Sequence, residues 1–280
     1  MDKLLRTLIE NGEISLVGID NTGMVRHAQI IHGMTAAAAT VFGKVITVMT
    51  YMSGWLKDEN SQISVNFKHH GETGEVCVSG DSAMHMRGYV YNPGAESAAI
   101  GKGYMTVVRD DNYKRPFVGT CEMISEEVDE NFEYYYRLSE QLPTYLKTQV
   151  SFDEHGLVKS AGGVFLQPMP GASEINKQYA QTMKAELANL GAMQEEKGVE
   201  GILKDLFGAK EIEEREIEYR CNCSREYIAG VLRGMGKDEL KDIVRSEGKI
   251  NVHCHYCNSD YDFFDADVDA LFETQENTDK

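Results

Sequence analysis

Two stretches of sequence decide how the C-terminal part of this chain folds: Cys221-Asn222-Cys223-Ser224-Arg225-Glu226 and Cys254-His255-Tyr256-Cys257. Thirty residues separate the two cysteine pairs. Zinc prefers four ligands at the corners of a tetrahedron, and each close pair of thiolates can supply one edge of it. Four thiolates fill the coordination sphere. The pattern therefore predicts one structural Zn²⁺ per chain, held by Cys221, Cys223, Cys254 and Cys257.

The residues around these cysteines predict a small zinc-binding domain, 219–280. Ser224 can cap a helix directly after the first pair, and Asp238 can cap a second helix. A strand from Ile250 then leads into Cys254, and a last helix is expected from Asp265. The metal would tie together the two ends of a segment, and closing a loop of this length contributes about 3–4 kcal/mol in the chain-entropy model.

The preceding segment, 173–218, predicts an amphipathic helical linker. Ser173 can cap a first helix, which we expect to end at Gly191. After a loop, apolar residues recur at helical spacing before Gly208. This second stripe consists of Val199, Ile202, Leu203, Leu206 and Phe207. Such helices can dock only through a narrow apolar face.

Residues 1–172 predict an α+β domain built on a mainly antiparallel sheet, with a hairpin near Asn11-Gly12. The apolar run Thr35–Leu56 predicts a long helix. We expect it to be buried rather than to span a membrane, because glycines and Lys44 interrupt the run and no Lys or Arg cluster flanks it. The strands that follow are separated by too little chain for helical crossovers.

Composition excludes several classes of partner. The net charge of −17 argues against nucleic acid or an anionic membrane, since both require clustered Lys and Arg. The first residues, Met1–Arg6, lack the features of a signal peptide. Cysteines in close pairs indicate metal or redox chemistry in a reducing, cytoplasmic location. Cys77 and Cys121 stand alone, and we expect them to be buried, inert thiols.

The cysteine pattern and the helices between the pairs resemble the zinc switch of the heat-shock protein 33 family of redox-regulated chaperones. Three motifs in the core agree with this family in order and spacing, so the resemblance covers nearly the entire chain. They are Gly88-Tyr89-Val90 with Asn92-Pro93, Tyr136-Arg137-Leu138-Ser139-Glu140-Gln141-Leu142-Pro143, and Ala161-Gly162-Gly163-Val164-Phe165-Leu166-Gln167-Pro168-Met169-Pro170.

The resemblance implies a cytoplasmic holdase that needs no ATP, binds unfolding proteins under oxidative stress, and is not an enzyme. In the family, the reduced zinc-bound form is inactive. Oxidants expel the zinc and form two disulfides, which carry over to Cys221 with Cys223 and Cys254 with Cys257. The switch and linker then unfold, clients bind, and the active protein dimerises. We expect the apolar stripe of the second linker helix to bind these clients.

The proposed disulfides differ physically from the zinc site that they would replace. Each would close only a tiny ring, and the Cys-x-Cys ring would be strained and easily reduced. Oxidation would thus replace a zinc site that connects the two cysteine pairs by two disulfides, each within one pair.

Two other functions remain open on the residues alone. A constitutive zinc-ribbon interaction module explains the four cysteines but neither the linker nor the core motifs. A thiol-disulfide oxidoreductase would use Cys254 and Cys257, yet this motif lies outside any βαβ context.

Overall fold

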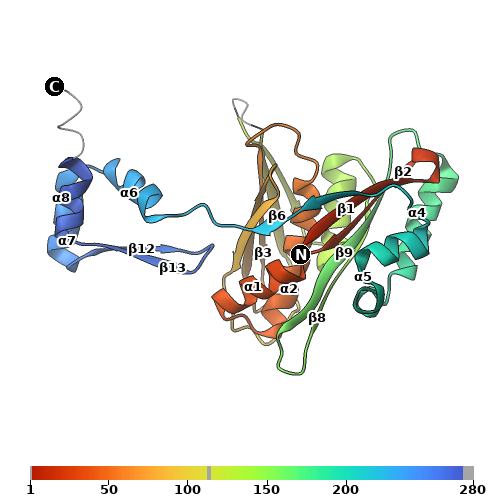
Figure 1. Cartoon of the computed structure of the whole chain (residues 1–280), viewed down its shortest axis with the longest axis horizontal. Coiled ribbons are helices and arrows are strands. Elements are labelled where there is room, and N and C mark those ends of the chain that lie inside the picture. Colours follow the sequence, from red (N-terminus) through yellow and green to blue (C-terminus); the bar gives the residue numbers. More distant parts are fainter. Residues whose placement is uncertain (1, 112–114, 274–280) are drawn as a thin grey trace. The chain divides into compact units, whose positions relative to one another are not determined.

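The computed structural model describes residues 2–111 and 115–273 (Figure 1). The chain forms two compact units, Met1–Arg220 and Cys221–Lys280. The predicted linker, 173–218, lies within the first unit, so its independence from the core remains a prediction. Mixed sheets and helices confirm the α+β class.

Two sheets form the first unit, and their strands pair antiparallel except where β11 joins β5. In spatial order, the five-stranded sheet contains β10 (Glu213–Glu216), β1 (Lys3–Ile9), β2 (Ile14–Asp20), β9 (Val158–Pro168) and β8 (Tyr145–Phe152). In the same way, the six-stranded sheet contains β11 (Glu218–Tyr219), β5 (His85–Val90), β4 (Glu75–Asp81), β3 (Gln62–His69), β6 (Gly103–Asp110) and β7 (Phe117–Glu122).

Helix α2 (Ala36–Ser53) packs between these sheets and is the long buried helix that the sequence predicts. The Thr35 hydroxyl caps it by accepting a hydrogen bond from the Ala38 amide at 3.1 Å. The helix is long and apolar enough to cross a membrane, but 78% of it is buried inside the protein. Such burial is what a core helix requires. Helices α1 (Thr22–His32) and α3 (Val128–Tyr135) complete this layer, and the sequence did not reveal them.

Strand β2 is buried on both faces. Val17 and Ile19 join the core that contains α2, whereas Ile14 and Leu16 belong to a second apolar cluster on the opposite face. Successive side chains of a strand point to opposite faces, so each face needs its own cover. Strand β9 is buried in the same way. The second face is covered by α4 (Glu174–Glu186) and α5 (Leu190–Phe207), to the right of the sheet in Figure 1.

The linker helices differ from the expectation in where they end and where they break, and α4 ends at Glu186 rather than at Gly191. Ser173 caps α4 as predicted, but the loop expected after Gly191 is wrong, because Gly191 already lies inside α5. The break falls at Gly198, which has φ 67° and ψ 168°, a conformation that glycine adopts far more readily than other residues. The predicted apolar stripe therefore starts directly after the break. The segment also contributes β10 and β11, which the prediction of a purely helical linker missed.

Helix α5 approaches the sheet very closely. Val199, Ile202 and Leu203 are at most 1% exposed, and Phe207 is 7% exposed. A Cβ atom placed on Gly18 of β2 would lie only 2.6 Å from Val199 Cγ2. The absence of a side chain at Gly18 thus permits the contact between helix and sheet.

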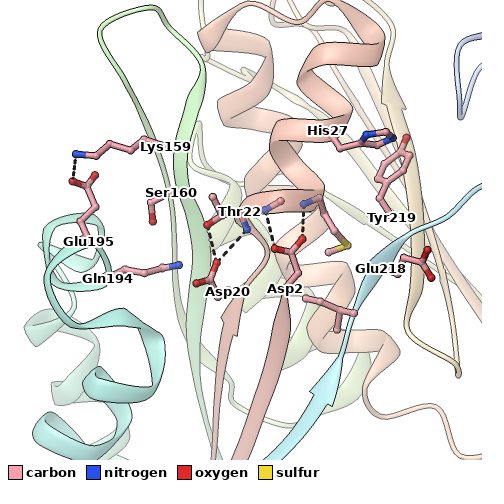
Figure 2. A pocket seen from close by; sticks show the side chains of 13 residues that line it. Asp2, Asp20, Thr22, His27, Lys159, Ser160, Gln194, Glu195, Glu218 and Tyr219 are labelled. Carbon is pink, nitrogen blue, oxygen red and sulfur yellow. Dashed lines mark hydrogen bonds and ion pairs between the residues drawn. The ribbon is translucent and has the colours of Figure 1, made fainter.

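Polar contacts hold the first half of α5. Gln194 donates a hydrogen bond to the carbonyl of Ala161 at 3.1 Å and accepts one from the side chain of Gln149 at 3.1 Å. Nearby, the Glu195 carboxylate lies 2.5 Å from Lys159 Nζ (Figure 2). These contacts fix the register of α5 along β8 and β9.

The second unit is small. It consists of α6 (Arg225–Arg233), α7 (Lys237–Glu247), β12 (Ile250–Cys254), β13 (Ser259–Phe263) and α8 (Asp265–Glu273). Ser224 caps α6 as predicted. The predicted cap at Asp238 is wrong, because α7 already begins at Lys237, preceded by Gly236 with φ 94°. Its small core consists of the buried apolar residues Ile228, Ala229, Leu232, Leu240, Val244, Ile250, Phe263, Val268 and Leu271.

Candidate metal centre

Local structure places the first cysteine pair at a helix start and the second at a hairpin turn. Cys221 and Cys223 precede α6, whose N-terminus is fixed by its serine cap. Cys254 ends β12 opposite Ser259 of β13. Cys257 lies in the turn between these strands, which closes through a left-handed residue, Asn258, with φ 54°. A helix start and a hairpin turn therefore present the two pairs to each other.

The four sulfur atoms all lie within 4.8 Å of one another. The Sγ atoms of Cys223 and Cys257 are 3.0 Å apart, those of Cys221 and Cys223 3.2 Å, and those of Cys221 and Cys254 3.7 Å. Sulfurs bound to one tetrahedral zinc would be separated by about 3.8 Å. All four residues are half-buried free thiols. The arrangement suits a metal ion in size, donor type and access.

The thiols influence one another electrostatically. Burial raises the pKa of the Cys221 thiol, and burial together with a hydrogen bond to Cys257 raises the pKa of Cys223. Burial also opposes ionisation of Cys257, but hydrogen bonds from Cys223 and Ser259 outweigh it and lower the pKa of Cys257 to about 7. The Cys257 thiol thus ionises more readily than those of Cys221 and Cys223. Since thiolates are the metal-binding form, a bound cation would displace the remaining protons.

The other two cysteines belong to the first unit. Cys121 is buried on β7, and burial raises its pKa. Cys77 on β4 is half-buried rather than buried, and desolvation raises its pKa to about 11. Among residues 2–111 and 115–273, the quartet is the one group of His, Cys, Asp or Glu side chains spaced to share a metal ion.

The structure adds residues that the sequence did not single out for these roles. The hydroxyl of Tyr261 lies 3.3 Å from Cys223 Sγ, beside the sulfur cluster. Gly18 and Gln194 hold the linker helix against the sheet. A strand glycine and a helix glutamine are too common to signal such roles. The predicted apolar stripe of α5 lies against β2 and β9 in the first unit.

Comparison with known proteins covers the whole chain. A model of the Hsp33 protein family matches residues 2–264. The 33 kDa chaperonin of Bacillus cytotoxicus is 33% identical, over 98% of this chain and 99% of that protein. The 33 kDa chaperonin of Acetivibrio thermocellus is 31% identical, over 99% and 98%.

A solved structure agrees with the sequence comparison. The crystal structure of the 33 kDa chaperonin from Thermotoga maritima superimposes with a TM-score of 0.87, at 27% identity, and covers 99% of both chains. The resemblance expected from the cysteine and core motifs is thereby confirmed. This chain belongs to the Hsp33 family of chaperones.

Proposed function

We propose that this chain is a redox-regulated, ATP-independent holdase of the cytoplasm rather than an enzyme. The reduced form holds one zinc ion through four thiolates and is inactive. Oxidation releases the zinc, frees the linker, and yields an active form that binds unfolding proteins and dimerises. The observation that carries the proposal is the convergence of four sulfurs within 4.8 Å from cysteine pairs that are distant in sequence.

The donor set favours zinc. Four thiolates in tetrahedral arrangement suit zinc or an iron–sulfur cluster, and zinc needs a single central ion with no redox change of its own. Because all four positions would be filled by Cys221, Cys223, Cys254 and Cys257, the ion would have a structural role. The unit around it has a small apolar core, so metal binding would supply a large share of its folding free energy.

Which cysteines form disulfides on oxidation decides whether the two cysteine pairs stay connected to each other. Disulfides between sequence neighbours, Cys221 with Cys223 and Cys254 with Cys257, leave the two cysteine pairs unconnected. The crossed disulfides, Cys221 with Cys254 and Cys223 with Cys257, would connect the two cysteine pairs as zinc does. Crossed sulfurs lie as close as neighbouring ones, so proximity alone does not select the pairing. We propose the neighbour pairing because it removes the connection between the two cysteine pairs.

The linker is suited to conditional release. Helix α5 covers apolar side chains of β2 and β9 with the stripe Val199, Ile202, Leu203, Leu206 and Phe207. Its flanking ion pair, Lys159 with Glu195, is partly exposed, and such pairs contribute about 0–1 kcal/mol. Undocking would therefore expose two apolar surfaces at once, one on α5 and one on the sheet. We propose that the α5 stripe contributes to client binding.

Removal of the metal should unfold the second unit of the reduced protein. We expect one zinc per chain, and its removal with a strong chelator should abolish cooperative melting of α6 and α7. A closed thiolate site contributes about 10 kcal/mol or more at neutral pH. Metal analysis with thermal unfolding monitored by circular dichroism checks this. Cys221→Ala should lose the zinc, whereas Cys77→Ala should retain it. Equal zinc content in both variants would contradict the assignment.

Disulfide mapping should find the neighbour pairs. After oxidation with hydrogen peroxide at elevated temperature, proteolysis and mass spectrometry should recover Cys221 linked to Cys223 and Cys254 linked to Cys257, together with free zinc. Recovery of Cys223 linked to Cys257 in the active protein would rule out release by local pairing. A chain that suppresses aggregation equally when reduced would instead favour the constitutive zinc-ribbon module.

Gly18→Ala should lower the oxidant dose needed for activation. Its new Cβ would clash with Val199, forcing α5 away from β2 without touching the cysteines. We expect half-maximal suppression of aggregation of a thermally unfolding client at about half the peroxide dose or less, since a loss near 1 kcal/mol changes the docking equilibrium by roughly fivefold. Gly94→Ala is the matched control, because its Cβ meets nothing closer than 3.6 Å. An unchanged dose for Gly18→Ala would argue against linker docking as the regulated step.

A further inference from the structure

One edge strand of each sheet in the first unit comes from the end of the linker, with β11 extending one residue beyond it to Tyr219. Strand β10 pairs antiparallel with β1 from Lys3↔Glu216 to Arg6↔Glu213. Strand β11 pairs parallel with β5 at two positions, Glu218↔His85 and Tyr219↔Met86. Since β10 and β11 are the outermost strands, their departure would leave the edges of β1 and β5 unpaired.

Backbone hydrogen bonds hold both strands at the sheet edges, and the buried Ile217 between the strands anchors them in the main core. The amides of Glu218 and Arg220 donate to the carbonyls of Met84 and Met86, at 3.1 and 2.8 Å. Strand β10 offers little apolar surface, since its sequence is Glu-Glu-Arg-Glu and its three glutamates are exposed. An extended backbone is thus what the two edges recognise.

Strand β11 and helix α5 both border a polar hollow of about 810 Å³ (Figure 2). Tyr219 of β11 lies on one side, beside the His27 ring, with centroids 5.2 Å apart. Gln194 and Glu195 of α5 lie on the other side. Over this stretch the linker borders solvent-accessible space on one side, while Ile217 and Tyr219 pack against the main core on the other.

We propose that the β1 and β5 edges vacated by the linker bind an extended segment of the unfolding client as an added strand. This inference rests on the proposed function and names the surface and partner that it uses. Strand addition draws its affinity from main-chain hydrogen bonds, so it accepts many sequences. Unpaired edges are templates for such pairing. The linker strands β10 and β11 occupy the edges in the way that a client segment would.

The β1 edge also indicates which segments bind best. Lys3 Nζ lies 3.0 Å from the Glu214 carboxylate of β10 and 3.6 Å from that of Glu200 on α5. Both acids belong to the linker, and they leave with it. The edge would then favour extended segments that carry a carboxylate within reach of Lys3, as Glu214 does from the position paired with Leu5.

A matched pair of peptides tests this binding mode on the oxidised full-length chain. The first is an unstructured, dye-labelled peptide with the repeating pattern Val-Thr-Val-Glu. The second has the same side chains but carries methyl groups on its central backbone nitrogens. We expect fluorescence anisotropy to show binding of the first, and binding weaker by about tenfold or more for the second, because several backbone hydrogen bonds are lost. Equal affinity of the two peptides overturns the proposal.

Hydrogen exchange at single amides locates the added strand. The Leu4 and Arg6 amides, which face β10, and the Met86 amide of β5 should lose protection on oxidation and regain it with the unmethylated peptide. The Lys3 and Leu5 amides, which face β2, should stay protected. Protection that returns with protein concentration alone would mean that the edges pair with a second copy of this chain, which overturns client binding there. Suppression of aggregation and zinc release are measured on the same sample. If both occur but the peptides bind equally, the inference fails and the proposed function stands; if neither occurs, the proposed function fails.

Discussion

The structure of the first unit depends on the double burial of β2 and β9. One face of these strands belongs to the permanent core with α2, and the other carries Ile14 and Leu16, which need a cover. Helix α5 is that cover, and Gly18 lets it approach. Ordering its 18 residues costs conformational entropy of the same order as the free energy gained by burying its few apolar side chains. A cover held with so small a margin is suited to conditional release.

The cysteine unit is joined to this cover by β11 and Arg220, directly before Cys221. Its own apolar core is small, and four thiols converge where its first residues meet the turn between β12 and β13. A metal ion at this point would stabilise the unit by closing it, and loss of the ion would return the chain between Cys223 and Cys254 to greater freedom. Disorder that begins at Cys221 would then act on a linker strand held by two residue pairs. The cysteine site and the apolar cover are thus close to each other along the chain.

Local patterns predicted much of this protein. Cysteine spacing identified the four residues that the structure brings together, helical periodicity identified the stripe on α5, and a long apolar run identified the buried helix α2. Non-local features escaped prediction. The acidic sequence Glu213–Glu216 has low strand propensity and becomes a strand because the edge of β1 is available. Gly236 replaces the expected cap at Asp238, and Gly198 breaks α5 where a longer loop was expected. Both breaks fall at glycines with positive φ, a local backbone feature that the prediction did not use.

The central claim is that the cysteine site controls the docking of α5. Hydrogen exchange of the full-length chain, measured before and after oxidative zinc release, tests it most directly. The account predicts that the amides of Val199–Phe207 and of β11 lose protection in proportion to the zinc released, while those of α2 stay protected. If α5 keeps its full protection after all zinc has left and the disulfides have formed, the cysteine site does not control the linker.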